Sequence, residues 1–473
     1  MPLAALLLAL GLLIGCAHVK APAPPARVEA PAYLPPPAEP PGYRSVLLAN
    51  GLRVSVLPDR STRKVALRIF HHIGSADEAQ DEHGLAHLVE HLLFGATTRY
   101  KKGDYDDFIH RSGASLSAYT SPDETVYGAV LLPAQLPELL QREADRMQNL
   151  IVTQADLDLE KRIVSEELRL RTESSRAGRI GALLLREALA GHPYGHLAGT
   201  PESIDKLTLK QVHAFYARHY RPGNAHLIVV GCIEPEATLA EIRRAFGAIE
   251  KGGTAAPPPL VPALHEWRLA EQVESKQDLA PGKAAVLAYP LPPADSPDRW
   301  ALLVLGKLLT GSRTNRLEAD LVKERHDAFA AGLQLTQLRR GGALFFWAAY
   351  LPYRRKQTAF KMLTAASERL SKLEWLTEDS LASAKRSLIL EDYHRMLSAA
   401  GLAVAIGDAQ RTYGEGRLAF SRAAHIGAVT LADVRAVYQR YLVSRIPTRV
   451  FLTPERVPLW ITLFGWLAPL VLR

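Results

Sequence analysis

The sequence predicts an α+β fold made of two similar halves. Short apolar runs typical of β-strands alternate with amphipathic helical patterns along most of the chain. The predicted strands are residues 51–58, 65–72, 125–132 and 226–231 in the first half and 285–291, 343–352 and 448–453 in the second. We expect the first two strands to pair as a hairpin. Strands grouped around helices in this way are typical of α+β proteins.

A pattern that returns after a constant interval indicates an internal duplication. Thr208 and Tyr216 recur as Thr430 and Tyr438, 222 residues later in both cases, and the hydrophobic positions between them match as well. Each copy is followed by a predicted strand. A helix-then-strand pattern repeated at one fixed offset is the signature of two related structural units.

Composition divides the 473 residues into six predicted segments. They are a signal peptide (1–16), a Pro- and Ala-rich linker (17–43), a first domain (44–250), an interdomain linker (251–264), a second, homologous domain (265–455) and an apolar C-terminal tail (456–473). The net charge is +8 and the pI is about 9.3. Lys and Arg are interleaved with acidic residues, which argues against a nucleic-acid partner.

The most informative motif is His-Leu-Val-Glu-His at 87–91, inside the apolar run HGLAHLVEHLLFG. On a helix, His87 and His91 project from one face about one turn apart, so two imidazole nitrogens can reach a single Zn²⁺. Glu90 shares that face and can act as a general base without being a ligand. His83 continues the four-residue spacing, and we interpret it as a residue at the helix start.

A third ligand must come from another element, and the predicted helix at 156–173 is the best candidate. Glu160 and Glu167 lie seven residues, or two turns, apart on nearly the same face, whereas Glu166 is one position off that face. From these residues alone, a solvated charged helix is the better interpretation.

The combined motifs resemble the pitrilysin and mitochondrial processing peptidase family of zinc peptidases. In that family, H-x-x-E-H is followed about seventy-five residues later by a ligand Glu, and 75 residues lie between His91 and Glu167 here. Further stretches that resemble family landmarks are ASLSAYTSPDETVY (114–127), HPYGHLAGTPESI (192–204) and FYARHYRPGNAHLIVVG (215–231). Together they extend over most of residues 44–250 in the expected order.

The resemblance implies the remaining parts of a zinc peptidase site. It makes Glu167 the third ligand of one Zn²⁺ per chain, Glu166 the next candidate, and Glu160 an auxiliary carboxylate. It also implies two domains of the same fold, each a mainly antiparallel sheet packed with helices, which enclose a cavity. A peptide substrate would lie extended along the strand ASLSAYT, beside Ser117 and Ala118.

The second half lacks this chemistry. Alignment of HLLFG with KLLTG places Leu303, Gly306 and Lys307 opposite His87, Glu90 and His91. The family resemblance also implies an Arg and a Tyr, seven residues apart, that hold the substrate carbonyl.

In this sequence, Val322 and Phe329 occupy the positions of that pair, and neither side chain donates a hydrogen bond. Arg325 could replace the Arg only in a shifted register. We therefore expect a zinc-bearing subunit that pairs with a homologous partner supplying the Arg and Tyr. The alternatives are a non-catalytic scaffold or a peptide-binding assembly factor of the same fold.

The ends of the chain predict export and membrane attachment. The apolar run LAALLLALGLLIG followed by Cys16 is typical of a bacterial lipoprotein signal, with lipidation at Cys16. We expect an enzyme anchored in the cell envelope and facing the periplasm, with the outer membrane favoured, and a C-terminal tail that contacts a membrane or a partner. Cys232, in the strand-like run LIVVGCI, is expected to be a buried, inert thiol.

Overall fold

The computed structural model describes residues 40–174, 186–189, 191–195, 199–252, 272–277, 282–311, 315–351 and 354–454. All of them belong to one compact unit, Pro36–Arg473. The predicted signal peptide with Cys16, nearly all of the first linker, most of the interdomain linker and the apolar tail lie outside the described residues.

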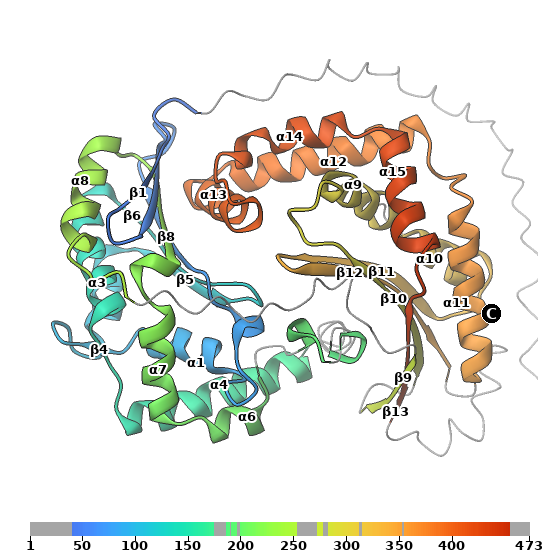
Figure 1. The fold of residues 1–473 in the computed structure, drawn as a ribbon, viewed down its shortest axis with the longest axis horizontal. Helices are drawn as coiled ribbons and strands as arrows, with labels where there is room; N and C mark the ends of the chain where they lie inside the picture. Colours follow the sequence, from blue (N-terminus) through green and yellow to red (C-terminus); the bar gives the residue numbers. More distant parts are fainter. Residues whose placement is uncertain are drawn as a thin grey trace, which may run out of the picture. The chain divides into compact units, whose positions relative to one another are not determined.

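The first half folds around a six-stranded sheet in the order β1-β2-β8-β3-β6-β5 (Figure 1). Its strands are β1 (Arg44–Leu47), β2 (Arg53–Pro58), β3 (Val65–His71), β5 (Ser115–Thr120), β6 (Thr125–Leu131) and β8 (Ala225–Gly231). The pair β2–β8 is parallel and the others are antiparallel.

The predicted hairpin of 51–58 with 65–72 is therefore wrong. The strand β8, from far along the sequence, lies between β2 and β3 and hydrogen-bonds to both, whereas β2 forms its hairpin with β1. A strand that is apolar on both faces can take a central position, and β8 is buried throughout.

Helices cover the first sheet. They are α1 (Leu85–Leu92), α2 (Asp104–Ser112), α3 (Leu136–Gln148), α4 (Gln154–Ser174), α6 (Pro201–Lys206), α7 (Leu209–His219) and α8 (Pro235–Phe246). Side chains of α2, α3 and α8 share one apolar core with the sheet, and those of α1, α4 and α7 form a second. Short elements complete this half, namely η1 (Ser75–Asp77), β4 (Ala96–Thr97), η2 (Pro133–Gln135), β7 (Leu150–Ile151), η3 (Pro193–Gly195) and η4 (Pro222–Asn224).

The second half repeats this arrangement around a five-stranded sheet in the order β11-β12-β10-β13-β9. Its strands are β9 (Gln272–Gln277), β10 (Lys283–Leu291), β11 (Ala330–Leu338), β12 (Gly341–Tyr350) and β13 (Thr448–Pro454). One pair, β9–β13, is parallel, as β2–β8 is in the first sheet. Apart from β1, the two sheets have the same order of strands, as an internal duplication requires.

The helical elements of the second half follow the same plan. They are α9 (Arg299–Thr310), α10 (Arg316–Glu318), the π-helix η6 (Ala319–Glu324), α11 (Lys356–Ser371), α12 (Glu378–Met396), α13 (Ala399–Tyr413), α14 (Leu418–Ala428), α15 (Leu431–Tyr438) and the π-helix η7 (Gln439–Val443). Thr208 and Thr430, the matched residues of the repeat, both act as N-caps, of α7 and α15.

Each half also covers the free face of the other half's sheet. The helix α13 of the second half packs on β3 and β8, where Ala403 and Ile406 join a core with Phe70 (Figure 1). In return, Leu189 and Tyr194 of the first half join a core with strands of the second sheet. Because each sheet is completed by the other half, the two halves depend on one another for burial of apolar surface.

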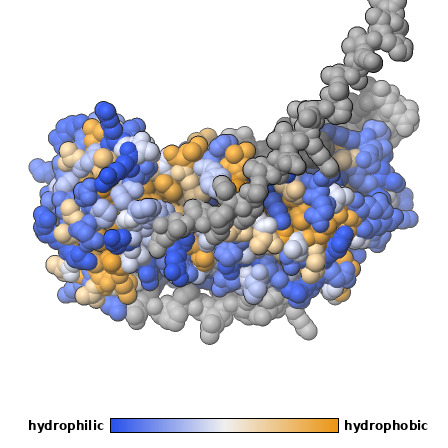
Figure 2. All heavy atoms as spheres, turned by 90° about the horizontal axis from the view of Figure 1, so that it is seen from above, coloured by the Kyte–Doolittle hydropathy of each residue, from blue (hydrophilic) through white to orange (hydrophobic). Residues whose placement is uncertain are grey.

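The surface agrees with the charged composition. Most of the face seen in Figure 2 is hydrophilic, with separate hydrophobic areas. In the described part of the chain, no helix is both long and apolar enough to cross a bilayer. The prediction for Cys232 is wrong, because β8 ends at Gly231 and the next residue is exposed.

Candidate metal centre

The helix α1 brings the motif residues onto a rigid, buried element. It begins after Gly84, whose φ of 96° suits glycine, and ends at Leu92, which makes it shorter than the predicted run of 83–95. The carboxylate of Glu78 accepts hydrogen bonds from the backbone N–H groups of Gly84 and Ala86 at 2.8 and 2.7 Å. Amide groups that the first turn would leave unsatisfied are thereby paired.

The long helix α4 packs against α1 and completes a three-residue cluster. The Oε2 atom of Glu167 lies 3.6 Å from Nε2 of His87 and 3.3 Å from Nε2 of His91. One ligand atom from each of these three side chains lies within 4.8 Å of the other two. Glu166, by contrast, is exposed and pairs with Arg169 at 3.5 Å, so the structure separates the two neighbouring glutamates.

The donor set fits a zinc ion. Two imidazole nitrogens and one carboxylate oxygen converge on one point, and His₂Glu is a ligand set of catalytic zinc, with a fourth position left for water. The two rings stand nearly perpendicular, with centroids 5.1 Å apart, so both Nε2 atoms can face the same ion. In the absence of a cation, packing three such polar groups together would carry a desolvation cost.

Another glutamate of α4, Glu160, contacts one of the candidate ligands, His91. The Oε2 atom of Glu160 lies 3.3 Å from Nδ1 of His91, the nitrogen on the far side of the ring from Glu167. Burial lowers the pKa of His91, but the hydrogen bond to Glu160 and the charge of three nearby carboxylates outweigh it, so the pKa is raised. A carboxylate in this position fixes the ring orientation and the tautomer of a metal-binding histidine.

The carboxylate of Glu90 is tied to the edge strand of the sheet. Thr120 Oγ1 on β5 donates a hydrogen bond of 2.6 Å to Glu90 Oε2. Thr120 was not among the predicted site residues, although it lies two residues after Ala118 and therefore on the same face of the strand. That spacing was the signal available in the sequence.

The strand β5 lies at the edge of its sheet and pairs with β6 alone among the described strands. Its residues alternate between exposed and half-buried. Ala118 packs toward the core of α1, whereas Ser117 lies on the opposite, exposed face. The two residues predicted to contact a peptide therefore point to different faces, and the free backbone edge is what they share.

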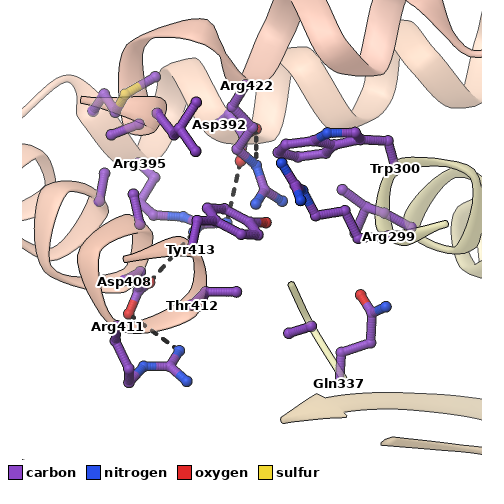
Figure 3. A pocket seen from close by; sticks show the side chains of 17 residues that line it. Arg299, Trp300, Gln337, Asp392, Arg395, Asp408, Arg411, Thr412, Tyr413 and Arg422 are labelled. Atoms are coloured by element: carbon purple, nitrogen blue, oxygen red, sulfur yellow. Dashed lines mark hydrogen bonds and ion pairs between the residues drawn. The ribbon is translucent and has the colours of Figure 1, made fainter. Parts of the chain in front are cut away.

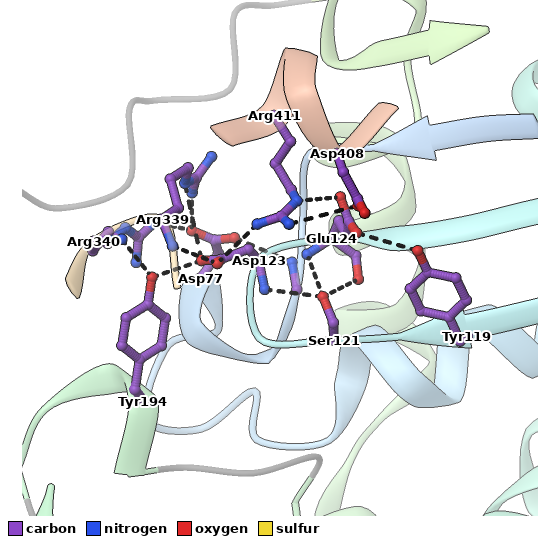
Figure 4. Close-up of polar contacts among 11 residues, drawn as sticks. Asp77, Tyr119, Ser121, Asp123, Glu124, Tyr194, Arg339, Arg340, Asp408 and Arg411 are labelled. Atoms are coloured by element: carbon purple, nitrogen blue, oxygen red, sulfur yellow. Dashed lines mark hydrogen bonds and ion pairs between the residues drawn. The ribbon is translucent and has the colours of Figure 1, made fainter. Parts of the chain in front are cut away.

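The turn after β5 is anchored by Tyr194 of the first half and by residues of the second half (Figure 4). Asp123 accepts hydrogen bonds from Tyr194 Oη at 2.8 Å and from the backbone N–H of Arg339 at 2.9 Å. Arg411 Nε of α13 lies 2.8 Å from Glu124 Oε2. Burial raises the pKa of Glu124 to about 7, although Arg411 opposes the shift.

The positions expected to hold an Arg and a Tyr carry no hydrogen-bond donor on their side chains. Val322 packs against the core of the second half, and Phe329 is 55% exposed. Arg325 Nε donates to Asp327 Oδ2 at 3.1 Å.

Two family models match this chain. The model of insulinase (peptidase family M16) matches residues 53–197, which contain the whole metal cluster. The model of the peptidase M16 inactive domain matches residues 206–388. The two matched segments together extend over more than half of the sequence.

Relatives of known sequence and structure agree with these models. The zinc protease PqqE of Helicobacter pylori is 28% identical over 338 residues, which cover 71% of this chain and 76% of the relative. An uncharacterized zinc protease of Mycobacterium leprae is 28% identical over 420 residues, 85% of this chain and 90% of the relative.

A crystal structure of a protease from Helicobacter pylori superposes with a TM-score of 0.78 at 25% identity, covering 87% of this chain and 99% of that one. A peptidase M16 inactive domain from Pseudomonas fluorescens has a TM-score of 0.73 at 19% identity over 88% of this chain and 98% of its own, a likeness of fold.

Proposed function

Since this chain belongs to the M16 family of zinc proteases, we propose that it is a metalloendopeptidase that hydrolyses extended peptides or unfolded segments. One observation carries the proposal. His87, His91 and Glu167 converge on one point, and Glu90, from the same helix, is bonded to the exposed edge strand β5. Metal ligands, a candidate base and a place for a peptide backbone therefore lie together.

The residues of the site have different roles in metal binding, proton transfer and peptide binding. His87, His91 and Glu167 hold one Zn²⁺ per chain, and Glu160 orients His91. When bound, Zn²⁺ supplies Lewis-acid chemistry that polarises a peptide carbonyl and acidifies water. Glu90 removes the proton from the attacking water and passes it to the leaving amine. The free edge of β5, at Ser117 and Ala118, pairs with the backbone of the peptide.

The substitution Glu90→Gln tests the assignment of the base. It keeps the size of the side chain and a hydrogen-bond acceptor for Thr120 but removes the proton acceptor. We expect zinc content to stay at the wild-type value and turnover of an internally quenched peptide to fall by about 10²–10⁴-fold. Near-normal hydrolysis would refute the role of Glu90. If the wild-type chain contains zinc but hydrolyses no peptide, the peptide-binding assembly factor is favoured. If the wild-type chain contains no zinc, the non-catalytic scaffold is favoured.

We further propose that this chain is the zinc-bearing subunit of a two-subunit enzyme. The support is the absence of donors at Val322 and Phe329, the positions where related enzymes are expected to carry an Arg and a Tyr. Mixing the chain with a homologue that has this pair and lacks H-x-x-E-H should raise turnover. Robust cleavage of peptides by the purified monomer would remove the need for a partner.

For location, we propose attachment to the bacterial cell envelope through a lipid on Cys16, facing the periplasm and with the outer membrane favoured. The support is the apolar run before Cys16 and the Pro-rich stretch after it. Metabolic labelling with a fatty-acid analogue should mark the wild-type chain and not Cys16→Ser. Equal labelling of both would exclude this anchor.

A further inference from the structure

A cavity of about 160 Å³ lies within the second half, between α9, α12, α13, α14 and β11 (Figure 3). Four arginines line it, and the two acidic residues of the lining are Asp392 and Asp408. Since one water molecule occupies about 30 Å³ in the liquid, there is room for several waters or for one side-chain-sized group.

Three of the arginines are already engaged with carboxylates. Arg422 Nε donates to Asp392 Oδ2 at 2.5 Å, and Arg395 lies 3.4 Å from the other oxygen of the same carboxylate. Arg411 lies 3.7 Å from Asp408 and also pairs with Glu124 outside the cavity. These contacts hold the wall of the cavity in a fixed arrangement.

Arg299 differs from the other three, because no carboxylate in the described part of the chain pairs with it. Its guanidinium carbon lies 4.8 Å from the centre of the Trp300 ring and 4.3 Å from that of Tyr413. Nη1 donates to the backbone oxygen of Asp295 at 3.2 Å. Aromatic contacts of this kind hold the plane of the group and leave its edge for a planar anion.

Three buried donor atoms of the lining have no hydrogen-bond partner among the described residues, and one of them, Nε of Arg411, forms an ion pair with Glu124 instead. The other two, Nε of Arg299 and Nε2 of Gln337 on β11, have no carboxylate partner either. A buried donor without a partner has a cost of desolvation that a bound acceptor would remove. Both side chains extend toward the cavity in Figure 3.

The wall of the cavity is connected to the strand on which a peptide is proposed to bind. Arg411 lines the cavity and lies 2.8 Å from Glu124, the residue just before β6. Glu124 in turn accepts a hydrogen bond of 3.2 Å from Tyr119 of β5 (Figure 4). A peptide that continues past the end of β5 would therefore leave the strand beside this wall.

We propose that this cavity binds a carboxylate of the peptide substrate, held by Arg299 and Gln337. The inference rests on the proposed function, because it names the class of peptide that the same site would prefer. The carboxylate is either an acidic side chain or the C-terminus of the peptide, since both present the same planar anion to a guanidinium.

Peptide binding to the zinc-loaded Glu90→Gln chain tests the proposal without turnover. Fluorescence anisotropy would measure the affinity of two pairs of labelled peptides. The members of the first pair differ only at the C-terminus, which is a free carboxylate or an amide. The members of the second pair differ only at one internal residue, which is Glu or Gln. We expect the carboxylate form of one pair to bind about tenfold more tightly than its neutral counterpart, as for a charge-assisted bond to Arg. The pair that shows the difference identifies the source of the carboxylate.

A second substitution on the same chain locates the effect. Arg299→Met keeps the aliphatic stem and should bring the affinity ratio close to one, and Gln337→Leu should reduce it. Arg435→Met, at an exposed position on α15 that does not line the cavity, is the matched control and should keep the wild-type ratio. The proposal would be overturned by an affinity ratio near one in the chain that carries Glu90→Gln alone. It would also be overturned if the tenfold ratio persisted after Arg299→Met is added.

Hydrolysis of the same peptide pairs by the wild-type enzyme distinguishes a failure of the carboxylate site from a failure of the proposed function. If the wild-type enzyme hydrolyses both members of each pair with equal KM, the enzyme assignment stands and the carboxylate site fails. If no peptide is hydrolysed but the Arg299-dependent preference in binding is present, the enzyme assignment fails and the site stands.

Discussion

The helix pair α1 and α4 in the first half has a counterpart in α9 and α12 of the second. The helices α4 and α12 each follow a threonine whose hydroxyl caps the first turn, Thr153 and Thr377. Glu167 lies fourteen residues after the first threonine, and Glu391 lies fourteen after the second. Lys307, which stands opposite His91 in the sequence alignment, forms an ion pair with Glu391.

The same contact between helices thus has different chemistry in the two halves. In the first, a carboxylate of α4 faces two imidazoles and leaves room for a metal ion. In the second, the ammonium group of Lys307 itself supplies the positive charge. Gly306 stands where Glu90 does, and a Cβ atom there would lie 3.0 Å from Leu335 Cδ1, so an apolar contact with β11 replaces the bond of Glu90 to β5.

The largest difference between the halves should appear when the matched glutamates are changed. Glu167→Gln removes one of three ligands, so zinc content should fall well below one ion per chain. Hydrolysis should drop by on the order of 10³-fold or more, because a metal contributes several kcal/mol to such reactions. Glu391→Gln should leave both quantities at the wild-type level. Elemental analysis and a peptide assay measure them, and equal effects of the two variants would contradict the comparison.

A smaller effect is expected from the residue that supports His91. The counterpart of Glu160, seven residues after the capping threonine, is Ala384, which is buried in the core of the second half. Glu160→Gln should weaken zinc binding by about 10–100-fold, because the ring of His91 loses its charged partner. Competition with a chelator measures the affinity. An unchanged affinity would mean that His91 is oriented by other contacts.

The bond between the base and the edge strand should contribute less again. Thr120→Val keeps the shape and the β-branched character of the side chain but removes the donor to Glu90. We expect kcat to fall about tenfold, in line with about 1.5 kcal/mol for a hydrogen bond to a charged group, with zinc content unchanged. A change in KM alone would assign Thr120 to peptide binding instead of to the position of Glu90.

The sequence predicted the parts of the site that follow from local spacing. His87, Glu90 and His91 lie within two turns of one helix, so their common face follows from helical geometry alone. The choice of Glu167 over Glu166 required the family resemblance, because both fit a charged helix. Its counterpart Glu391 was missed, since the offset is 216 residues between His91 and Lys307 but 224 between Glu167 and Glu391.

Long-range pairing was the part of the fold that the sequence did not predict. Proximity in the chain favoured a hairpin of β2 with β3, yet β8 separates them because it is apolar on both faces. The sequence also did not predict that α13 packs on the sheet of the first half or that the segment around Tyr194 packs on the sheet of the second half. An apolar pattern shows that a face is buried and does not show which half of the chain buries it.

The smallest effect is expected from the ion pair of the second half. Lys307→Gln leaves Glu391 without its cation, but the side chain of Glu391 is 51% exposed and can be solvated. Ion pairs of this kind contribute about 0–1 kcal/mol, so the free energy of unfolding in urea should change by no more than that, and zinc content and turnover should not change. A loss of zinc would mean that this ion pair also affects the metal site of the first half. The comparison of the two halves would then be wrong, because the Lys307–Glu391 ion pair would support metal binding instead of standing in its place.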